Sequence, residues 1–537
     1  MFNRLHHPFD LESFSLVCKR FLALTNRLRR HLSLLDSTLL INGTISKLIH
    51  RFSHIISIDL SNFQGDLDLV VLDLANSVSS YTSNIEQLDI SNQKQLPVTG
   101  LKELGRKLKA QSFPFLEEFD CSYSSTDLNP YPEHINPSDL AVTDSGIEVL
   151  SVNLRNLRRI NVSRIELITD KSLVALSKNC LNLQGIDVVD CPLITSKGVH
   201  SILRSCTALS WISVSEIHFP RSRSGFERLA SCRRALQTLN VTSSMISDEF
   251  LLLMAKSSLP LSRLSICWCI NFTLSGISLL LCAYQSLKYL SLVQVDFLSD
   301  ESMNDLSKYL QILVTIDVSG CKRLTISTFF TLARNCPLLE AINMGSTDLG
   351  TKDSFHNGVK NPRIRSVNLR YNWYLDDGTL TKVALMCPNM EILDVSTCLS
   401  LTEAGIASVL EVCNQIRNLQ FESCPLIKHI GEGAELPNVE VVSAATSAIN
   451  DEGLALIGSR CSRLLKLNLT FCEGVTADGI QAMVTNCRSL RGIQLKMCPQ
   501  KITIAETGEF PYVLHGDELL SIFVARQLKM AKFCYCE

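Results

Sequence analysis

The sequence predicts an α/β solenoid of about 17 strand–helix repeats. A cysteine series supports this, with members 26 residues apart in three pairs: Cys180 and Cys206, Cys387 and Cys413, and Cys461 and Cys487. A leucine-type position also recurs every 23 to 27 residues, at Leu157, Leu183, Leu209, Leu236, Leu261, Leu287, Leu313, Leu339, Ile364, Met390, Ile416, Val439, Leu464 and Leu490. A fixed period of this length is typical of stacked repeats.

Each repeat is expected to contain a short strand, a turn and a helix. The segments "PNMEILDVSTCLSLTEAGIASVLEVC" (388–413) and "SRLLKLNLTFCEGVTADGIQAMVTNC" (462–487) share L-x-x-L-x-L-x-x-C, then T-x-x-G, then a helix ending in Cys. Alternation places two apolar residues on one strand face, and the helix buries Ile406, Val409, Leu410 and Cys413. Because one repeat cannot close a core alone, stacking predicts a leucine-rich-repeat horseshoe with strands on its concave side.

In chain order we expect a short helical piece at 1–31, the solenoid at 32–503 and a C-terminal cap or tail at 504–537. Ile55, Ile85 and Leu116 begin less regular repeats. The 41 residues from Leu116 to Leu157 include "SSTDLNPYPEHINPSDLA" (124–141), whose composition predicts an extended rim loop. This loop is either a tolerated insertion or a cover for a ligand or partner.

Two later segments have simpler expectations. Arg221, Arg223, Arg228, Arg233 and Arg234 form a local basic run, which predicts a solvated face because no wider basic stripe accompanies it. The tail segment "DELLSIFVARQLKM" (517–530) predicts a helix that caps the last core.

Composition narrows the partners and the compartment. The net charge of -2 gives no general attraction to nucleic acid, and no apolar run approaches the roughly 18–20 residues of a membrane span. We therefore expect neither nucleic acid nor membrane among the partners. With 21 cysteines and no visible secretory signal, reduced thiols in the cytoplasm, the nucleus or both are expected.

The repeat explains the cysteines as small buried hydrophobes, so no metal site is predicted. Zinc sites favour C-x-x-C spacing, whereas Cys267/Cys269 and Cys534/Cys536 are C-x-C pairs. No phosphate-binding loop, nucleophile elbow or H-E-x-x-H occurs. We expect no catalytic residue and no cofactor.

Large side chains beside the outward strand positions predict a protein-binding surface on the concave face, because aromatic residues and Arg commonly anchor interfaces. Its expected centre is Arg370 with the following "YNWY". The alternative is that the rings pack on neighbouring strands. The candidate target-binding residues are Trp268, Arg370, Tyr371, Trp373, Tyr374, Glu422, Phe471 and Lys496.

The opening "FDLESFSLVCKRFLALTNRLRR" (9–30) follows another pattern. Its apolar residues recur at gaps of three or four, and its basic residues suit a helix C-terminus. Such a helix could simply cap the solenoid. The apolar residues are Leu11, Phe14, Val17, Cys18, Phe21 and Leu24.

The wording "DLESFSLVCKRFLAL" resembles the second half of an F-box, typically D-L-x-x-x-S-L-V-C-K-x-F/W. Followed by Cys-bearing repeats, the chain resembles the F-box/leucine-rich-repeat family, and its long array is similar to plant members. The resemblance implies a non-catalytic substrate-recognition subunit of an SCF-type (Skp–cullin–F-box) ubiquitin ligase, whose repeats bind an unidentified target for degradation. It also implies binding to a Skp-type adaptor, and through it a cullin, by Leu11, Ser15, Leu16, Val17, Cys18, Lys19 and Phe21.

The Leu-Pro that usually opens an F-box does not precede this segment, so we expect an N-terminally incomplete box. The alternative function is a leucine-rich-repeat scaffold that recruits no ligase. A third hypothesis, a receptor gated by a small molecule, requires a polar pocket under the loop at 124–141.

Overall fold

The computed structural model describes mainly residues 26–34, 51–76, 84–92, 115–122, 142–219, 235–350, 359–430, 436–487 and 489–495, with gaps at 53, 62 and 64. Leu22, residues 47–48 and three two-residue strands near the C-terminus are also described. The chain divides into two compact modules. The N-terminal module comprises Met1–Leu264 and Cys269–Phe272, and the C-terminal module comprises Ser265–Trp268 and Thr273–Glu537.

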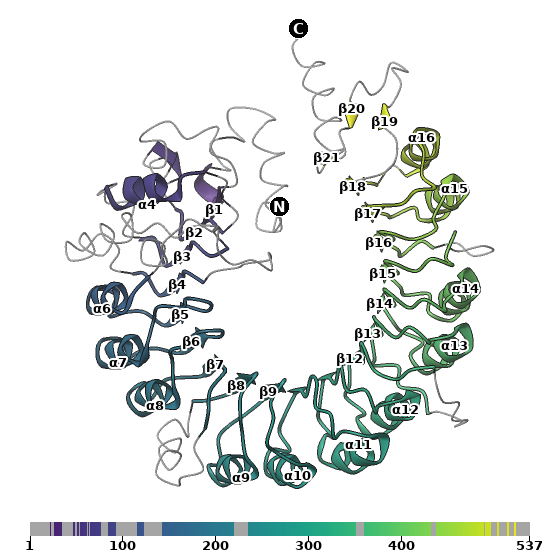
Figure 1. The fold of residues 1–537 in the computed structure, drawn as a ribbon. Coiled ribbons are helices and arrows are strands. Elements are labelled where there is room, and N and C mark those ends of the chain that lie inside the picture. The colour runs from purple at the N-terminus through teal and green to yellow at the C-terminus, as the bar shows by residue number, and fades with distance from the viewer. Residues whose placement is uncertain are drawn as a thin grey trace. The chain divides into compact units, whose positions relative to one another are not determined.

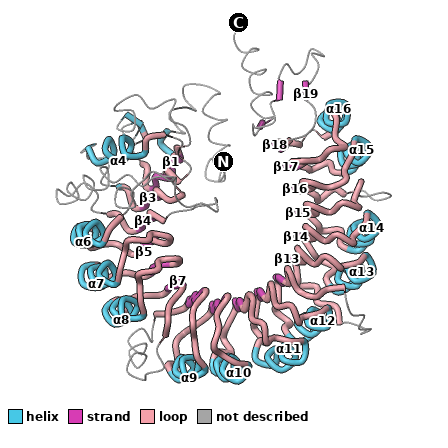
Figure 2. The backbone as a smooth tube through the Cα atoms, in the orientation of Figure 1, coloured by secondary structure: helices cyan, strands magenta, loops and turns pink. Residues whose placement is uncertain are grey.

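In the N-terminal module, short strands pair in parallel, each with the next along the chain, and their central apolar residues stay in register. Figures 1 and 2 show the helices together on the other side of the strands. The strands are β1 (His31–Ser33), β2 (Ser57–Asp59), β3 (Gln87–Asp89), β4 (Glu118–Asp120), β5 (Arg159–Asn161), β6 (Gly185–Val188), β7 (Trp211–Ser215) and β8 (Thr238–Thr242). The helices are α4 (Leu67–Asn76), α6 (Asp144–Asn153), α7 (Asp170–Asn179), α8 (Ser196–Ser205) and α9 (Asp248–Lys256).

The C-terminal module repeats the same two layers (Figure 1). Strands β10 to β18 pair in parallel in chain order, and β9 (Arg263–Cys267) contributes its last three residues to this module. These strands are β10 (Tyr289–Ser291), β11 (Thr315–Asp317), β12 (Ala341–Asn343), β13 (Ser366–Asn368), β14 (Ile392–Asp394), β15 (Asn418–Gln420), β16 (Val441–Ser443), β17 (Lys466–Asn468) and β18 (Gly492–Gln494). The helices are α10 (Leu274–Ala283), α11 (Asp300–Leu306) with the 3-10 turn η7 (Ser307–Tyr309), α12 (Ile326–Asn335), α13 (Asp377–Met386), α14 (Glu403–Val412), α15 (Asp451–Arg460) and α16 (Ala477–Asn486).

This architecture confirms the predicted leucine-rich-repeat solenoid. Each regular leucine-type position predicted above is buried, and a strand begins two residues after it. The predicted inner face of α14 is also buried, including Ile406, Val409, Leu410 and Cys413. The pattern follows because L-x-L alternation and a helical stripe meet in one core per repeat.

The sheet begins one strand earlier than the sequence pattern indicated. Strand β1 pairs in parallel with β2, and its central residue Leu32 is buried. Arg29 occupies the place where the first leucine of the pattern would stand. Residues around β1 therefore form a repeat that lacks the leucine found at this position in the regular repeats.

The cysteines do more than fill space. Among the described cysteines all except Cys267 and Cys282 are buried. The Cys398 thiol donates to the carbonyl of Leu369 in the preceding repeat (3.3 Å), and the Cys424 thiol donates to Val395 (3.3 Å). Each thiol thus bonds to the neighbouring repeat while its sulfur packs as an apolar group.

Helix starts are linked from repeat to repeat. The Thr402 hydroxyl and backbone N–H donate to the Asp377 carboxylate of the preceding helix (2.7 and 2.9 Å). Gly405 lies so close to this carboxylate that a Cβ there would be 2.3 Å from Asp377 Oδ1. The T-x-x-G motif therefore pairs a helix cap with the small residue that the bonded Asp requires.

The last part of the chain differs from expectation where it is described. Strand β21 (Leu520–Ser521) pairs antiparallel with β18, so the helix predicted over 517–530 is wrong at these residues. The open edge of β18 carries unpaired backbone groups, which an added strand satisfies. A second short pair joins β19 (Ile502–Thr503) to β20 (Val513–Leu514). Within the described parts, no helix has the length and apolarity to cross a membrane.

Candidate partner-binding rim

A sharp backbone bend ends the strand of each repeat. The residue at the bend has positive φ in every described repeat of the C-terminal module, as at Tyr371 (φ 61). Its N–H donates to the next repeat, from Tyr371 to the carbonyl of Ser396 (2.8 Å). In this module the bend residues are Trp268, Gln294, Gly320, Ser346, Tyr371, Thr397, Ser423, Thr446 and Phe471. The bends therefore lie in a row along the carboxyl ends of the strands, and we call this edge of the module its rim.

The polar residues at the ends of the strands form hydrogen bonds that stabilise the bend. The side-chain oxygen of Asn368 accepts the N–H of Arg370 (3.0 Å), and Asp394 accepts the N–H of Ser396 (2.9 Å). These contacts turn the chain out of the strand, as Asn and Asp commonly do in turns. Some of the hydrogen-bonding capacity of these outward Asn and Asp side chains is therefore used within the chain and is not available to a partner.

The predicted centre of the site lies on this rim instead of on the strand faces. Tyr371, Trp373 and Tyr374 follow β13 in the loop before α13, and the sequence pattern could not distinguish this loop from the concave face. The inward Asn372 amide fixes the loop by donating to the carbonyls of Leu369 (2.8 Å) and Met344 (2.9 Å).

Arg370 and Tyr371 form one preorganised pair. The Arg370 guanidinium carbon lies 4.6 Å from the centroid of the Tyr371 ring, and Nη2 donates to the Tyr371 hydroxyl (3.0 Å). The stem of Arg370 passes over Gly345, where an added Cβ would be 3.1 Å from Arg370 Cγ. The missing side chain at Gly345 and the ring at Tyr371 together fix the position of the cation.

Large apolar surface surrounds this pair. Trp373 is 56% exposed and Tyr374 is 65% exposed, so neither ring is packed away on a neighbouring strand. Leu399 and Leu426, at 44% and 46%, stand in the corresponding loops of the next two repeats. The sequence signal that could have found them is the leucine one or two residues after Cys398 and Cys424. We define the aromatic rim as Arg370, Tyr371, Trp373, Tyr374, Leu399 and Leu426.

The other predicted target-binding residues lie elsewhere. Trp268 and Phe471 occupy the same bend position four repeats before and after Tyr371, ~19 Å away along the sheet in each direction. The Glu422 carboxylate accepts from the Ser443 hydroxyl and from Asn468 (3.3 Å). These residues are therefore not gathered into the aromatic rim, and Lys496 lies outside the described residues.

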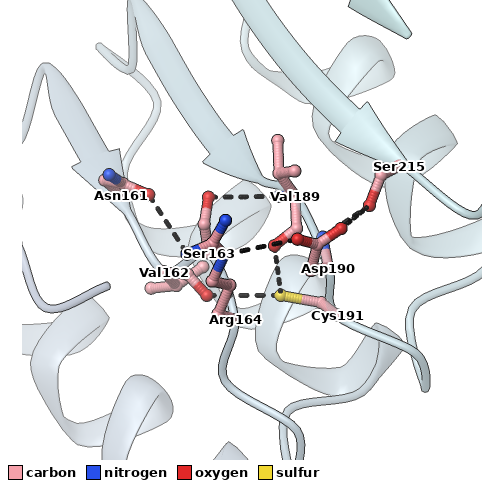
Figure 3. Close-up of polar contacts among 8 residues, drawn as sticks. All are labelled: Asn161, Val162, Ser163, Arg164, Val189, Asp190, Cys191 and Ser215. Atoms are coloured by element: carbon pink, nitrogen blue, oxygen red, sulfur yellow. Dashed lines mark hydrogen bonds and ion pairs between the residues drawn. The ribbon is translucent and has the colours of Figure 1, made fainter. Parts of the chain in front are cut away.

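The N-terminal module satisfies its corresponding rim internally. Arg164, also at a left-handed bend, is 3.3 Å from the Asp190 carboxylate, which accepts the Ser215 hydroxyl (3.1 Å). Figure 3 shows this chain of contacts beside the Cys191 thiol, which donates to Val162 (3.2 Å). At this bend, therefore, the cation Arg164 already has a carboxylate partner within the same module.

Carboxylates also stack on adjacent strands of the N-terminal module. Asp59 is in register with Asp89, and Asp89 with Asp120. Burial raises the pKa of Asp89, opposed by hydrogen bonds from Ser91 and reinforced by the charges of Asp120 and Asp59. Across the described residues, no group of three His, Cys, Asp or Glu side chains is arranged to bind a metal ion.

Comparison with known proteins identifies relatives over part of the chain. No protein-family model matches. F-box/LRR-repeat protein 4 of Bos taurus is 24% identical over 137 residues, covering 25% of this chain and 22% of that protein. F-box protein MAX2 of Arabidopsis thaliana is 26% identical over 138 residues, covering 24% of this chain and 20% of that protein. These matches support the F-box/leucine-rich-repeat family. The chain thus spans about a fifth of the length of these relatives.

Two solved structures also match. The yeast Rad7–Elc1 complex matches at 15% identity and a TM-score of 0.43, covering 76% of this chain and 88% of that one. The mouse RP105/MD-1 complex matches at 14% identity and a TM-score of 0.44, covering 87% and 85%.

The F-box-like segment lies outside the described residues. Its adaptor-binding role therefore stays a prediction for Leu11, Ser15, Leu16, Val17, Cys18, Lys19 and Phe21. The loop at 124–141 and the basic run at 221–234 also lie outside them, as does the pocket that a small-molecule receptor would need.

Proposed function

We propose that this protein is the substrate-recognition subunit of an SCF-type ubiquitin ligase and binds a target protein for ubiquitin-dependent degradation. The family supports the F-box role, since both curated relatives are named as F-box proteins. The aromatic rim is the observation that carries the target-binding role. Exposed aromatic residues beside an Arg are typical anchors of protein interfaces.

In this proposal the chain makes and breaks no bonds. The segment with Leu16 and Val17 binds a Skp-type adaptor, which attaches to a cullin. The stacked repeats then present the bound target to a ubiquitin carrier, raising the effective concentration of target lysines. The proposed compartment is the cytoplasm, the nucleus or both, and the described cysteines are free thiols, as reduced surroundings require.

Co-purification with a Skp-type adaptor tests the ligase role. We expect Leu16→Asp combined with Val17→Asp to abolish adaptor binding, because both residues belong to the predicted adaptor-binding set and the charge at Val17 would enter the apolar face of the expected helix. The matched control is Leu181→Asp, which changes an exposed repeat leucine and should leave adaptor binding unchanged.

Absence of adaptor binding, even after the missing Leu-Pro half of an F-box is restored ahead of the segment, would contradict the proposal. The scaffold alternative makes the opposite prediction in cells. If the chain only scaffolds partners, the Leu16 and Val17 changes will leave the turnover of its bound proteins unaltered. The ligase role predicts that these proteins accumulate.

A further inference from the structure

The aromatic rim contains a cation, Arg370, that no carboxylate of the described residues neutralises. Arg370 donates one hydrogen bond, to the neutral Tyr371 hydroxyl, and no carboxylate of a described residue lies within ion-pair distance of its guanidinium. Its Nε–H is buried and has no acceptor. Leaving such a donor unpaired costs about 1–3 kcal/mol, and because this N–H is covered, a carboxylate of a partner can reach only the Nη side of the guanidinium.

The neighbouring carboxylates are already engaged. Asp394, on the next strand, is buried and accepts the N–H of Ser396 (2.9 Å). Glu422, two repeats further, accepts from Ser443 and Asn468. On the preceding side, Asp317 accepts from Ser319 and from Asn343 (3.0 Å).

Other arginines of the chain show the paired alternative. Arg164 pairs with Asp190 at a bend of the N-terminal module (Figure 3), and Arg365 pairs with Glu391 at the opposite ends of the strands. The chain can therefore supply carboxylates to its arginines. Arg370 differs because its position is fixed by a ring and a glycine and not by an acid.

The bend beneath the pair has its own free-energy penalty. A bulky residue with positive φ costs on the order of 1–3 kcal/mol, and most bend residues of this module are small or polar. Tyr371 adopts this conformation although the residue is 45% exposed and is not held in the core. Its ring and hydroxyl both contact the Arg370 guanidinium.

Apolar surface continues from the pair into the next repeats. The Ser400 hydroxyl donates to the carbonyl of Trp373 (2.9 Å), which joins the loop after β13 to the loop after β14. The exposed Leu399 lies in the second of these loops, beside Ser400. One fixed cation therefore borders a row of exposed apolar side chains.

We propose that the aromatic rim binds an extended segment of a partner protein in which a carboxylate side chain is flanked by apolar side chains. The carboxylate pairs with Arg370, and the apolar groups pack on Trp373, Tyr374 and Leu399. A carboxylate fits the single positive charge, whereas phosphate recognition commonly uses a cluster of cations. This inference rests on the proposed substrate-receptor function and names the class of segment that the receptor recognises.

Selection from a displayed library of random twelve-residue peptides tests the proposal, with the full chain as bait. We expect enriched peptides to share an Asp or Glu within three residues of Leu, Phe, Tyr or Trp. Arg370→Glu should weaken their binding at least tenfold and shift a fresh selection toward Lys and Arg. The matched control Arg204→Glu makes the same charge change on the exposed surface of α8 and should alter binding less than twofold.

Two further variants separate the parts of the rim. Arg370→Lys keeps the charge but loses the planar fork, so we expect an affinity between those of wild type and Arg370→Glu. Trp373→Ala should weaken binding at least tenfold without lowering the melting temperature, because the ring is more than half exposed. If Arg370→Glu fails to fold, Arg370→Lys and Trp373→Ala still decide the question.

Three outcomes would overturn the proposal. They are a selection without acidic enrichment, affinities that Arg370→Glu leaves unchanged, and phosphoserine peptides that bind more than tenfold tighter than their Asp versions. Adaptor co-purification from the same preparations keeps the two hypotheses separate. Loss of adaptor binding alone counts against the ligase role, whereas loss of acidic-peptide binding alone counts against the rim.

Discussion

At the scale of the residue, the stack depends on side chains that reach into the next repeat. The Asp377 carboxylate accepts two hydrogen bonds from Thr402, and Asp451 accepts two from Thr476. These contacts place an acid at the N-terminus of one helix and the cap of the next beside each other, which also suits the helix dipole. The glycine that follows leaves room for the carboxylate.

Gly405→Ala tests this fit. Alanine normally stabilises a helix relative to glycine, but its Cβ would be 2.3 Å from Asp377 Oδ1 and 3.2 Å from Asp377 Cα. We expect a loss of about 1–3 kcal/mol in the free energy of unfolding, measured by urea denaturation. Gly378→Ala is the matched control, because its nearest neighbour is 3.8 Å away, and it should stabilise the protein slightly. Equal effects of the two variants would contradict the packing argument.

The hydrogen bonds of Asp144 at the start of α6 make the stability of the protein depend on pH. Burial raises the pKa of its carboxyl, but hydrogen bonds from Ser172 and Thr169 outweigh burial, and the net pKa is lowered. A folded pKa below the unfolded value of about 3.9 means that the stabilisation is present at neutral pH. It is then lost as the pH falls through the folded pKa.

We therefore expect Asp144→Asn to lower the urea midpoint at pH 7 relative to wild type, with the difference shrinking below about pH 4. Paired denaturation curves at pH 7 and pH 3 measure this. A difference that stays constant across this range would show that the charge of Asp144 contributes nothing.

At the scale of the element, many helices, such as α8, α12 and α14, end on a buried thiol. The Cys413 thiol lies 3.3 Å from the carbonyl of Cys387, and the Cys206 thiol 3.7 Å from that of Cys180. Burial raises the pKa of Cys336 to about 12 and that of Cys413 to about 11. These helix ends therefore stay protonated and apolar at neutral pH.

Pulsed alkylation with iodoacetamide at pH 8 reports this environment. Cys282 is exposed on α10 and should react under native conditions, whereas Cys336 at the end of α12 should react only after denaturation. A pKa near 12 leaves roughly a thousandfold less thiolate than the ordinary value of about 9, and the packed sulfur is also inaccessible. Mass spectrometry of the two peptides gives the rates. Comparable native rates would contradict the buried placement of Cys336.

At the scale of the whole molecule, stability is expected to be a sum over neighbouring repeats. Within the C-terminal module the register is repeated from strand to strand, as in Val367 with Leu393 and Leu393 with Leu419. A repeat of standard length can therefore be removed without changing how its neighbours meet.

Deletion of residues 390–415 removes one repeat and joins Asn389 to Ile416. We expect the shortened chain to keep its circular dichroism per residue and to unfold cooperatively, with a moderately lower melting temperature. Deletion of residues 390–402 is the control. It removes β14 and leaves α14 without the strand on which it packs, so it should destabilise the protein more. The prediction fails if the two deletions unfold the protein to the same degree.

Much of the fold could be predicted from the sequence because one pattern is repeated. Leu157 and its equivalents mark each core, and cysteines such as Cys398 and Cys424 follow several of the bends, so period and register follow from spacing. Strand β1 could not be predicted from this pattern because Arg29 stands where the first leucine is expected. The candidate rim could be predicted only in part, since Tyr371 and Trp373 are visible as exposed aromatics but their loop is not.

The sequence by itself determined the repeat, its length and the apolar faces of its strands and helices. Local patterns suffice for these because each repeat packs only on its neighbours. Only the tertiary structure decided that Tyr371 bends at positive φ, that Arg370 lies on its ring over Gly345, and that Leu399 borders them. Apart from the contact between the adjacent Arg370 and Tyr371, those properties depend on contacts between residues about 25 positions apart, such as Gly345 with Arg370 and Tyr371 with Ser396, where one repeat meets the next.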